Sequence, residues 1–149
     1  MGKVLNDVRV IQKCFVVNQD GLILAPRRDS ADRARGGKWD LPGGGYEEGE
    51  DIFAAIAREV QEEAGLTIKS AVPLYVTNQT DSTAELYFGH HVFVIAWVCR
   101  DWEGSVTLSD EHEAAEWVSP ADFLTYDFGS DDGFFAAATR AYLALPSSI

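Results

Sequence analysis

The chain has 149 residues, of which 46% are hydrophobic and 24% are charged, the composition of an ordinary globular protein. This length predicts one domain over residues 1–149. Twelve basic against 24 acidic residues give a formal net charge of −12, which argues against polymeric nucleic acid and membranes as partners, because both require basic patches.

Hydropathy and cysteine content indicate a cytoplasmic protein. Charged or polar residues interrupt every apolar stretch before it reaches membrane-spanning length, and the N-terminus has no long apolar run. The two cysteines, Cys14 and Cys99, lie far apart in apolar segments. We therefore expect two buried free thiols, which suit a reducing compartment.

The chain begins with a predicted β-hairpin. Residues 9–17 are rich in β-branched side chains, residues 18–21 supply a turn, and residues 22–25 form the returning strand. A polar loop over residues 27–38 then holds five of the twelve basic residues. It leads into a proline and three glycines, residues 42–45, whose backbone can take conformations closed to other residues.

An acidic helix is predicted next. One face carries apolar residues at helical spacing, namely Ile52, Phe53, Ile56 and Val60. Gly65 ends the helix as a C-cap glycine does. Glu59, Glu62 and Glu63 project from one side, where like charges repel. A bound hard cation, Mg²⁺ or Mn²⁺, would offset that repulsion; the alternative is a fully solvated acidic helix.

The second half of the chain predicts strands and two further helices. The expected extended segments are residues 66–77, 85–88, 91–100 and 114–118, and Pro73 marks an edge or a bulge in the first of them. Ser119 and Pro120 predict the start of a helix that runs to Leu124. A last helix is expected over residues 133–145, capped by residues 130–132.

The acidic helix and the glycine run together resemble the signature of the Nudix hydrolases. We call residues Gly44 to Leu66 the Nudix box; its matched positions are Gly44-x5-Glu50-x7-Arg58-Glu59-Val60-Gln61-Glu62-Glu63-Ala64-Gly65-Leu66. The flanking residues 39–43 and 111–118 also look like the family.

The resemblance implies an α/β/α sandwich with a mixed sheet and the box helix packed on it. It implies a MutT-like, Mg²⁺-dependent hydrolase, with Mn²⁺ as an alternative, that cleaves a nucleoside diphosphate linked to another group by attack of water on phosphorus.

Roles for the box residues follow from the same resemblance. Glu59 and Glu63 are the expected metal ligands, Glu62 is a third or water-mediated ligand, and the carbonyl group of Gly43 is a further one. Glu50 is expected to pair with Arg58 and so to orient the carboxylates.

The general base is less sharply defined by the resemblance. Glu59 and Glu62 are candidates inside the box, whereas Glu111 and Glu113 lie in a later loop that brings a carboxylate to the metal in relatives. We favour Glu111, because it stands six residues before Trp117 in an Asp-Glu-His context similar to that of the family.

The basic loop and the tryptophan at its end are the predicted substrate contacts. We predict that some of the basic residues of this loop, above all Arg27, Arg28 and Lys38 but also Arg33 and Arg35, help to bind phosphates. Trp39 could stack on a base. The alternatives are an exposed loop that balances an acidic protein and, for Trp39, core packing.

The expected partner is a nucleotide-type small molecule, bound by a monomer or homodimer. A nucleoside triphosphate, an oxidised nucleotide and a nucleotide sugar all stay open, because the markers of the ADP-ribose, NADH, coenzyme A and diadenosine polyphosphate branches are absent or incomplete. A non-catalytic sensor with the same fold is the alternative function, although such proteins usually lose a box carboxylate. Processing of a messenger-RNA 5′ end is disfavoured by the acidic charge.

Overall fold

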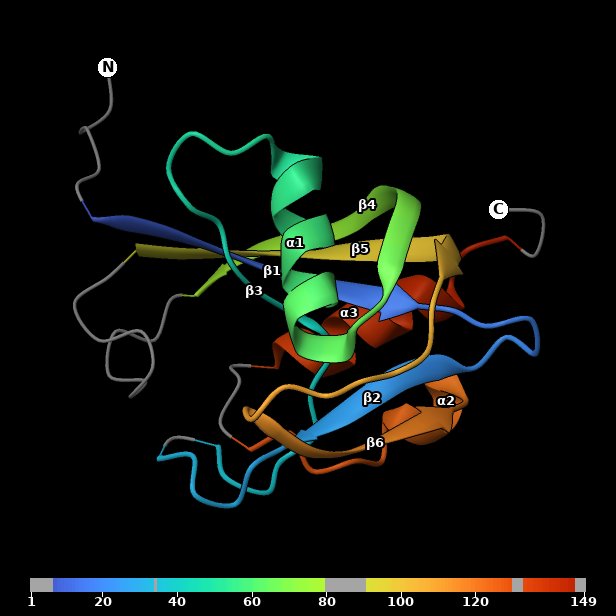
Figure 1. The fold of residues 1–149 in the computed structure, drawn as a ribbon. Helices are drawn as coiled ribbons and strands as arrows, with labels where there is room; N and C mark the ends of the chain where they lie inside the picture. The colour runs from blue at the N-terminus through green and yellow to red at the C-terminus, as the bar shows by residue number, and fades with distance from the viewer. Residues whose placement is uncertain (1–6, 34, 80–90, 130–132, 147–149) are drawn as a thin grey trace.

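A computed structural model describes residues 7–33, 35–79, 91–129 and 133–146 of the chain (Figure 1). The elements in chain order are β1 (Val8–Val16), β2 (Ile23–Arg28), β3 (Gly43–Gly45), α1 (Ile52–Ala64), β4 (Thr67–Gln79), β5 (His91–Glu103), β6 (His112–Val118), α2 (Pro120–Phe123) and α3 (Phe134–Leu143). The α/β class predicted from the sequence is confirmed. Within the described residues, no helix combines the length and the apolar character needed to cross a membrane.

The strands form two sheets. A four-stranded mixed sheet has the order β3-β1-β5-β4, with β1 parallel to β5 and the other pairs antiparallel, and a two-stranded sheet pairs β2 with β6. The predicted hairpin pairing is wrong, because β1 and β2 share only the bridge between Val17 and Ile23. The Asn18 side chain does form the expected turn by accepting from the amides of Asp20 and Leu22. Both strands are largely buried, so each pairs instead with a strand from later in the chain.

The glycine run forms the short strand β3. Gly43 lies opposite Lys13 and Gly45 opposite Ile11 in an antiparallel ladder. Gly43 has φ 151°, and a Cβ there would lie 1.9 Å from the Gln12 carbonyl oxygen. Only glycine therefore allows β3 to lie this close to β1.

Two apolar layers hold the helices against the four-stranded sheet. Alternate side chains of β1 point to opposite faces: Cys14 and Val16 pack with the apolar face of α1, while Phe15 packs towards α3 and stacks on Tyr142 at a centroid distance of 5.3 Å. Figure 1 shows α1 and α3 on opposite sides of this sheet, with β2, β6 and α2 beside it. Cys14 and Cys99 are free and buried, as expected.

Local capping sets the ends of the helices. Asp51 accepts from the amides of Phe53 and Ala54 at the start of α1, and Gly65 ends this helix with φ 73°. Ser119 caps α2. Helix α3 ends at Leu143, two residues before the predicted end; its predicted cap and the predicted strand at residues 85–88 lie outside the described residues.

Candidate functional site

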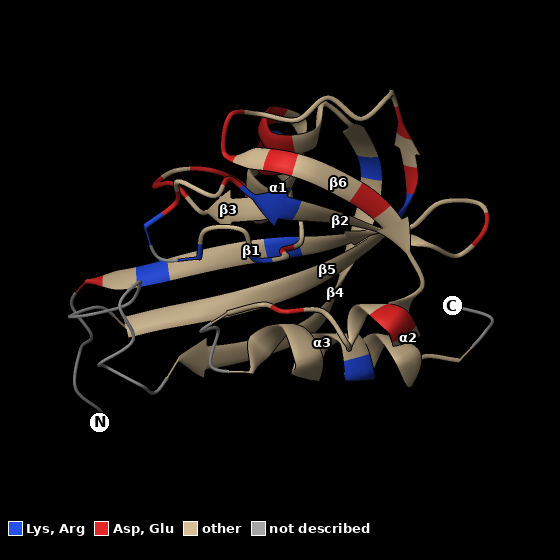
Figure 2. Cartoon of the chain, turned by 90° about the horizontal axis from the view of Figure 1, so that it is seen from below, with Lys and Arg blue, Asp and Glu red and all other residues tan. Residues whose placement is uncertain are grey.

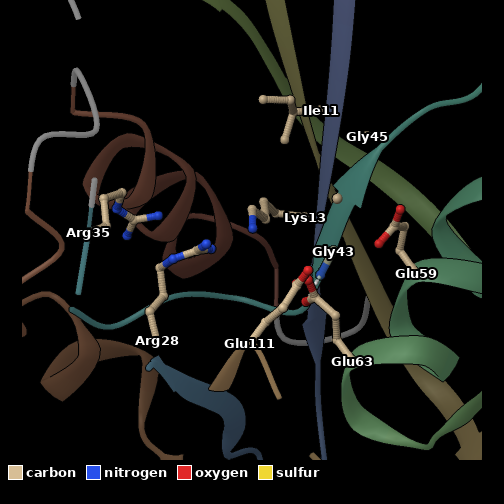
Figure 3. Close-up of a pocket in the computed structure, with 10 residues that line it drawn as sticks. Ile11, Lys13, Arg28, Arg35, Gly43, Gly45, Glu59, Glu63 and Glu111 are labelled. Carbon is tan, nitrogen blue, oxygen red and sulfur yellow. Dashed lines mark hydrogen bonds between the residues drawn. The ribbon is translucent and has the colours of Figure 1, made fainter. Parts of the chain in front are cut away.

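A pocket of about 310 Å³ lies where α1 meets the glycine strand β3 and the basic strands β1 and β2, at the lower end of the volumes of ligand-binding pockets. Ten residues line it, namely Ile11, Lys13, Arg28, Arg35, Gly43, Gly44, Gly45, Glu59, Glu63 and Glu111 (Figure 3). The acidic side chains come from α1 and from the residue before β6, and the basic ones from β1, β2 and the loop after β2. Figure 2 shows basic positions on neighbouring parts of β1 and β2.

Glu63 is the most deeply placed acid of the pocket. Only 6% of the residue is exposed, and its carboxylate accepts from the Gly43 amide at 3.0 Å. Burial raises the pKa of Glu63 to about 8, although the nearby Lys13 ammonium opposes that shift, and a hydrogen bond with the Glu111 carboxyl group adds to it. The two carboxyl groups of Glu63 and Glu111 therefore meet at one point in the pocket.

Glu59 lies one helical turn before Glu63 and packs on the glycine strand. A Cβ on Gly44 would lie 2.3 Å from Oε2 of Glu59, so the absence of a side chain at Gly44 leaves the room that this carboxylate occupies. Burial also raises the pKa of Glu59, against the attraction of Arg58. Glu59, Glu63 and Glu111 together provide only carboxylate oxygens, the donor set that suits a hard divalent cation.

Arg58 holds the carboxylates on the outer side of α1. Its Nε and Nη2 donate to Glu50 at 2.8 and 2.9 Å, and its Nη1 donates to Glu59 at 3.1 Å and to Glu62 at 3.2 Å. These hydrogen bonds between Arg58 and Glu50 lower the pKa of Glu50 and raise that of Arg58. The contact between Glu50 and Arg58 that the sequence predicts is therefore present.

The three carboxylates predicted to cluster on the helix do not converge. The Glu62 side chain is 56% exposed and does not line the pocket. Within the described residues, no group of three His, Cys, Asp or Glu side chains is already arranged around a single metal position. Arg58 explains this spread, because it draws Glu59 and Glu62 towards its own guanidinium.

Glu111 is anchored from two sides. The amides of Thr107 and Ser109 donate to the carbonyls of Ala64 and Glu63 at 2.8 and 3.2 Å, which fastens the preceding loop to the end of α1. The carbonyl of Glu111 itself accepts from the Asp29 amide at 2.9 Å. The alternative base Glu113 points elsewhere, since its carboxylate pairs with Arg27 and the Ser30 hydroxyl.

A buried carboxylate organises the basic side of the pocket. Asp40 is fully buried and lies 3.0 Å from Lys13 Nζ, 3.1 Å from Arg28 Nη1 and 3.9 Å from Arg35 Nη1. Burial alone would raise the pKa of Asp40, but the Lys13 ammonium, with His112 and Arg35, holds it well below its usual range. His112 is buried beside it, with Nε2 3.6 Å from Oδ2 of Asp40.

The predicted substrate contacts separate into two groups. Arg28 and Arg35 line the pocket. Arg27, Arg33 and Lys38 do not: Arg27 pairs with Glu113 at 3.1 Å, and Lys38 pairs with Asp127 at 2.6 Å. Trp39 also lies outside the lining, packed against Tyr126 at a centroid distance of 4.9 Å with Arg27 over its ring.

Lys13 and Asp40 are pocket-forming residues that sequence reasoning missed. A signal for Lys13 was available, because a lysine in the apolar run of β1 must be paired if the strand is buried. Its partner could not be identified from the pattern, since 26 residues separate them in the chain.

Comparison with known proteins places most of the chain among relatives of one kind. The family model described as NUDIX domain matches residues 8–138. The chain is 31% identical to the CTP pyrophosphohydrolase of Escherichia coli (strain K12) over 118 residues, which cover 78% of this chain and 81% of the relative. It is 30% identical to nucleoside triphosphatase NudI of Salmonella schwarzengrund over 89% of this chain and 92% of the relative. The crystal structure of the MutT protein from Methanosarcina mazei Go1 superposes with a TM-score of 0.74 and 27% identity, covering 94% of this chain and 99% of that one.

Proposed function

The chain belongs to the Nudix family, and from this premise we propose that it is a Mg²⁺-dependent pyrophosphohydrolase that cleaves a nucleoside diphosphate linked to another group. The observation that carries the proposal is the pocket itself, in which Glu59, Glu63 and Glu111 face Lys13 and Arg28. Phosphoryl transfer needs charge neutralisation, an oriented water and a base. The three carboxylates, with a bound metal ion, can supply each of them.

Glu59 and Glu63 would hold the metal ion, with Gly43 beside them on β3. Bound Mg²⁺ supplies charge neutralisation at the phosphoryl oxygens. Arg58 and Glu50 orient the carboxylate of Glu59 through the hydrogen bonds already present. For Glu62 we favour contact through water over direct ligation, because its side chain does not line the pocket.

Glu111 is our candidate for the general base, in preference to Glu59 and Glu62. Replacing it with glutamine should lower turnover roughly 10²- to 10⁴-fold, the usual contribution of general base catalysis, with little change in metal affinity. The amide can keep a hydrogen bond to Glu63 but cannot accept a proton from water. Steady-state kinetics and calorimetric Mg²⁺ titration check this expectation.

The matched control is Glu113→Gln, because Glu113 stands two residues away and pairs with Arg27 outside the pocket. We expect turnover close to that of the unmodified protein. Full activity of Glu111→Gln would move the base into the Nudix box.

Among substrates, we propose nucleoside triphosphates. The names of the two relatives support this class, since one is a CTP pyrophosphohydrolase and the other a nucleoside triphosphatase. The charge of the pocket supports this class as well, because six of its ten lining residues are charged and can contact a metal ion or phosphate groups.

The deciding experiment measures product release from a substrate panel with Mg²⁺ and then Mn²⁺. The panel contains ordinary, deoxy and oxidised nucleoside triphosphates, nucleotide sugars and ADP-ribose, with products resolved by chromatography. Preferred hydrolysis of triphosphates is the expected result, and the products identify the bond that is cleaved. Binding of metal and nucleotide without any turnover would instead support a nucleotide sensor.

A further inference from the structure

Lys13 lies on β1, a central strand of the four-stranded sheet. The proposed chemistry does not yet explain the position of its ammonium group. Only 8% of the residue is exposed, and it lines the pocket. Its ammonium lies 3.0 Å from Asp40, which is its hydrogen-bonding partner within the described residues. An ammonium group has three donors, so Lys13 keeps N–H groups available to a ligand in the pocket.

The two neighbouring arginines are much more fully engaged by the protein. Arg28 donates to Asp32 through Nε and Nη2 and to Asp40 through Nη1. Arg35 donates to the carbonyls of Phe128 and Trp39 at 2.9 and 2.7 Å. Each guanidinium keeps further N–H groups, but these contacts fix its orientation. The Lys13 ammonium is held at a single point, by Asp40, and can turn its remaining N–H groups towards a ligand.

The charge balance of this side of the pocket favours an anion. Lys13, Arg28 and Arg35 are paired on this side of the pocket with Asp32 and Asp40, while Glu59, Glu63 and Glu111 line the opposite side, where a bound metal ion would offset their charge. Figure 3 shows the Lys13 ammonium between the arginines and the meeting point of Glu63 and Glu111. A phosphate chain bound through metal at the acidic side of the pocket would therefore extend from there to the Lys13 ammonium.

We propose that Lys13 binds an oxygen of a third substrate phosphate, one that the metal ion does not hold, and so makes the protein prefer nucleoside triphosphates to nucleotide sugars. This inference rests on the proposed function of the pocket. A terminal phosphate carries roughly −1.5 to −2 charge at pH 7, and a charge-assisted hydrogen bond to it is strong. A nucleotide sugar has only two phosphates and ends in an uncharged group, so it has no partner for Lys13.

The test compares the unmodified protein with Lys13→Met and Lys13→Arg on one triphosphate and one nucleotide sugar. We expect Lys13→Met to lower kcat/KM for the triphosphate roughly 10- to 100-fold, the loss that follows from one hydrogen bond to a charged group, with little change for the nucleotide sugar. Lys13→Arg should restore most of the preference. Calorimetry should show the same loss for a non-hydrolysable triphosphate.

A purely structural role for Lys13 predicts a different result. It would lower the melting temperature and reduce both activities by the same factor, leaving their ratio unchanged, and that outcome would overturn the inference. Lys69→Met is the matched control, because Lys69 is an exposed lysine on β4 that pairs with Glu103. If the unmodified protein hydrolyses neither compound, the proposed function fails first; an unchanged ratio in an active protein rejects the role of Lys13 alone.

Discussion

Replacing Glu63 with glutamine is expected to remove divalent-cation binding and nearly all turnover while leaving the fold intact. The glutamine has the shape of the native side chain and can still accept the hydrogen bond from the Gly43 amide. It lacks the charge that a hard cation requires of its ligands. We expect a loss larger than the roughly 10- to 100-fold cost of changing a group that merely supports a metal ligand.

The stability of the metal-free variant should stay the same or increase. A carboxylate in this position is buried and close to Glu59 and Glu111, so its charged form is costly in the absence of a cation. Calorimetric Mg²⁺ titration, kinetics and thermal unfolding together measure the effect. Glu48→Gln is the matched control, since Glu48 is an exposed acid in the same box. Native metal affinity in Glu63→Gln would reject Glu63 as a ligand.

The Nudix helix could be predicted well because its determinants are local. Asp51 and Gly65 cap it through contacts within one turn, and its apolar face repeats at helical spacing. The separation of Glu62 from Glu59 and Glu63 could not be predicted from that spacing. All three share an arc of the helix, but Arg58 Nη1 donates to both Glu59 and Glu62, whereas Glu63 turns to the Gly43 amide on β3. These contacts with Arg58 and with a strand outside the helix are not contained in the spacing.

The basic side of the pocket depends on contacts between distant segments, which periodicity does not encode. Lys13 meets Asp40 because β3 pairs with β1 and brings the residues before the glycine run beside that strand. The pairing of β2 with β6 similarly places Arg28 opposite His112. Arg27, which precedes Arg28 in β2, and Lys38, in the loop after β2, have the same charge as Arg28 but pair with Glu113 and Asp127 instead.

Asp40 is the residue whose loss should cost the fold most, since it is the common partner of the buried cations. Replacing it with asparagine should lower the free energy of unfolding by about 3–5 kcal/mol at pH 7, as breaking a buried ion pair does when its partners stay behind. Lys13 and Arg35 are both less than 10% exposed and would retain their charges without this carboxylate. Chemical denaturation measures the difference.

The difference in stability between the native protein and Asp40→Asn should depend on pH, and this dependence tests the ion pairs of Asp40 independently. The pKa of Asp40 in the folded protein is held well below its usual range by Lys13 and its neighbours despite burial, whereas an unfolded aspartate titrates near about 3.9. A lowered pKa stabilises the fold above the unfolded value, and this contribution is lost as the pH falls below about 4. The stability gap between the native protein and Asp40→Asn should therefore be constant between about pH 5 and 8 and should narrow under acid conditions. Asp127→Asn removes an exposed partner of Lys38 and should change little at any pH. A stability difference that stays constant below about pH 4 would show that Asp40 acts through packing rather than through its charge.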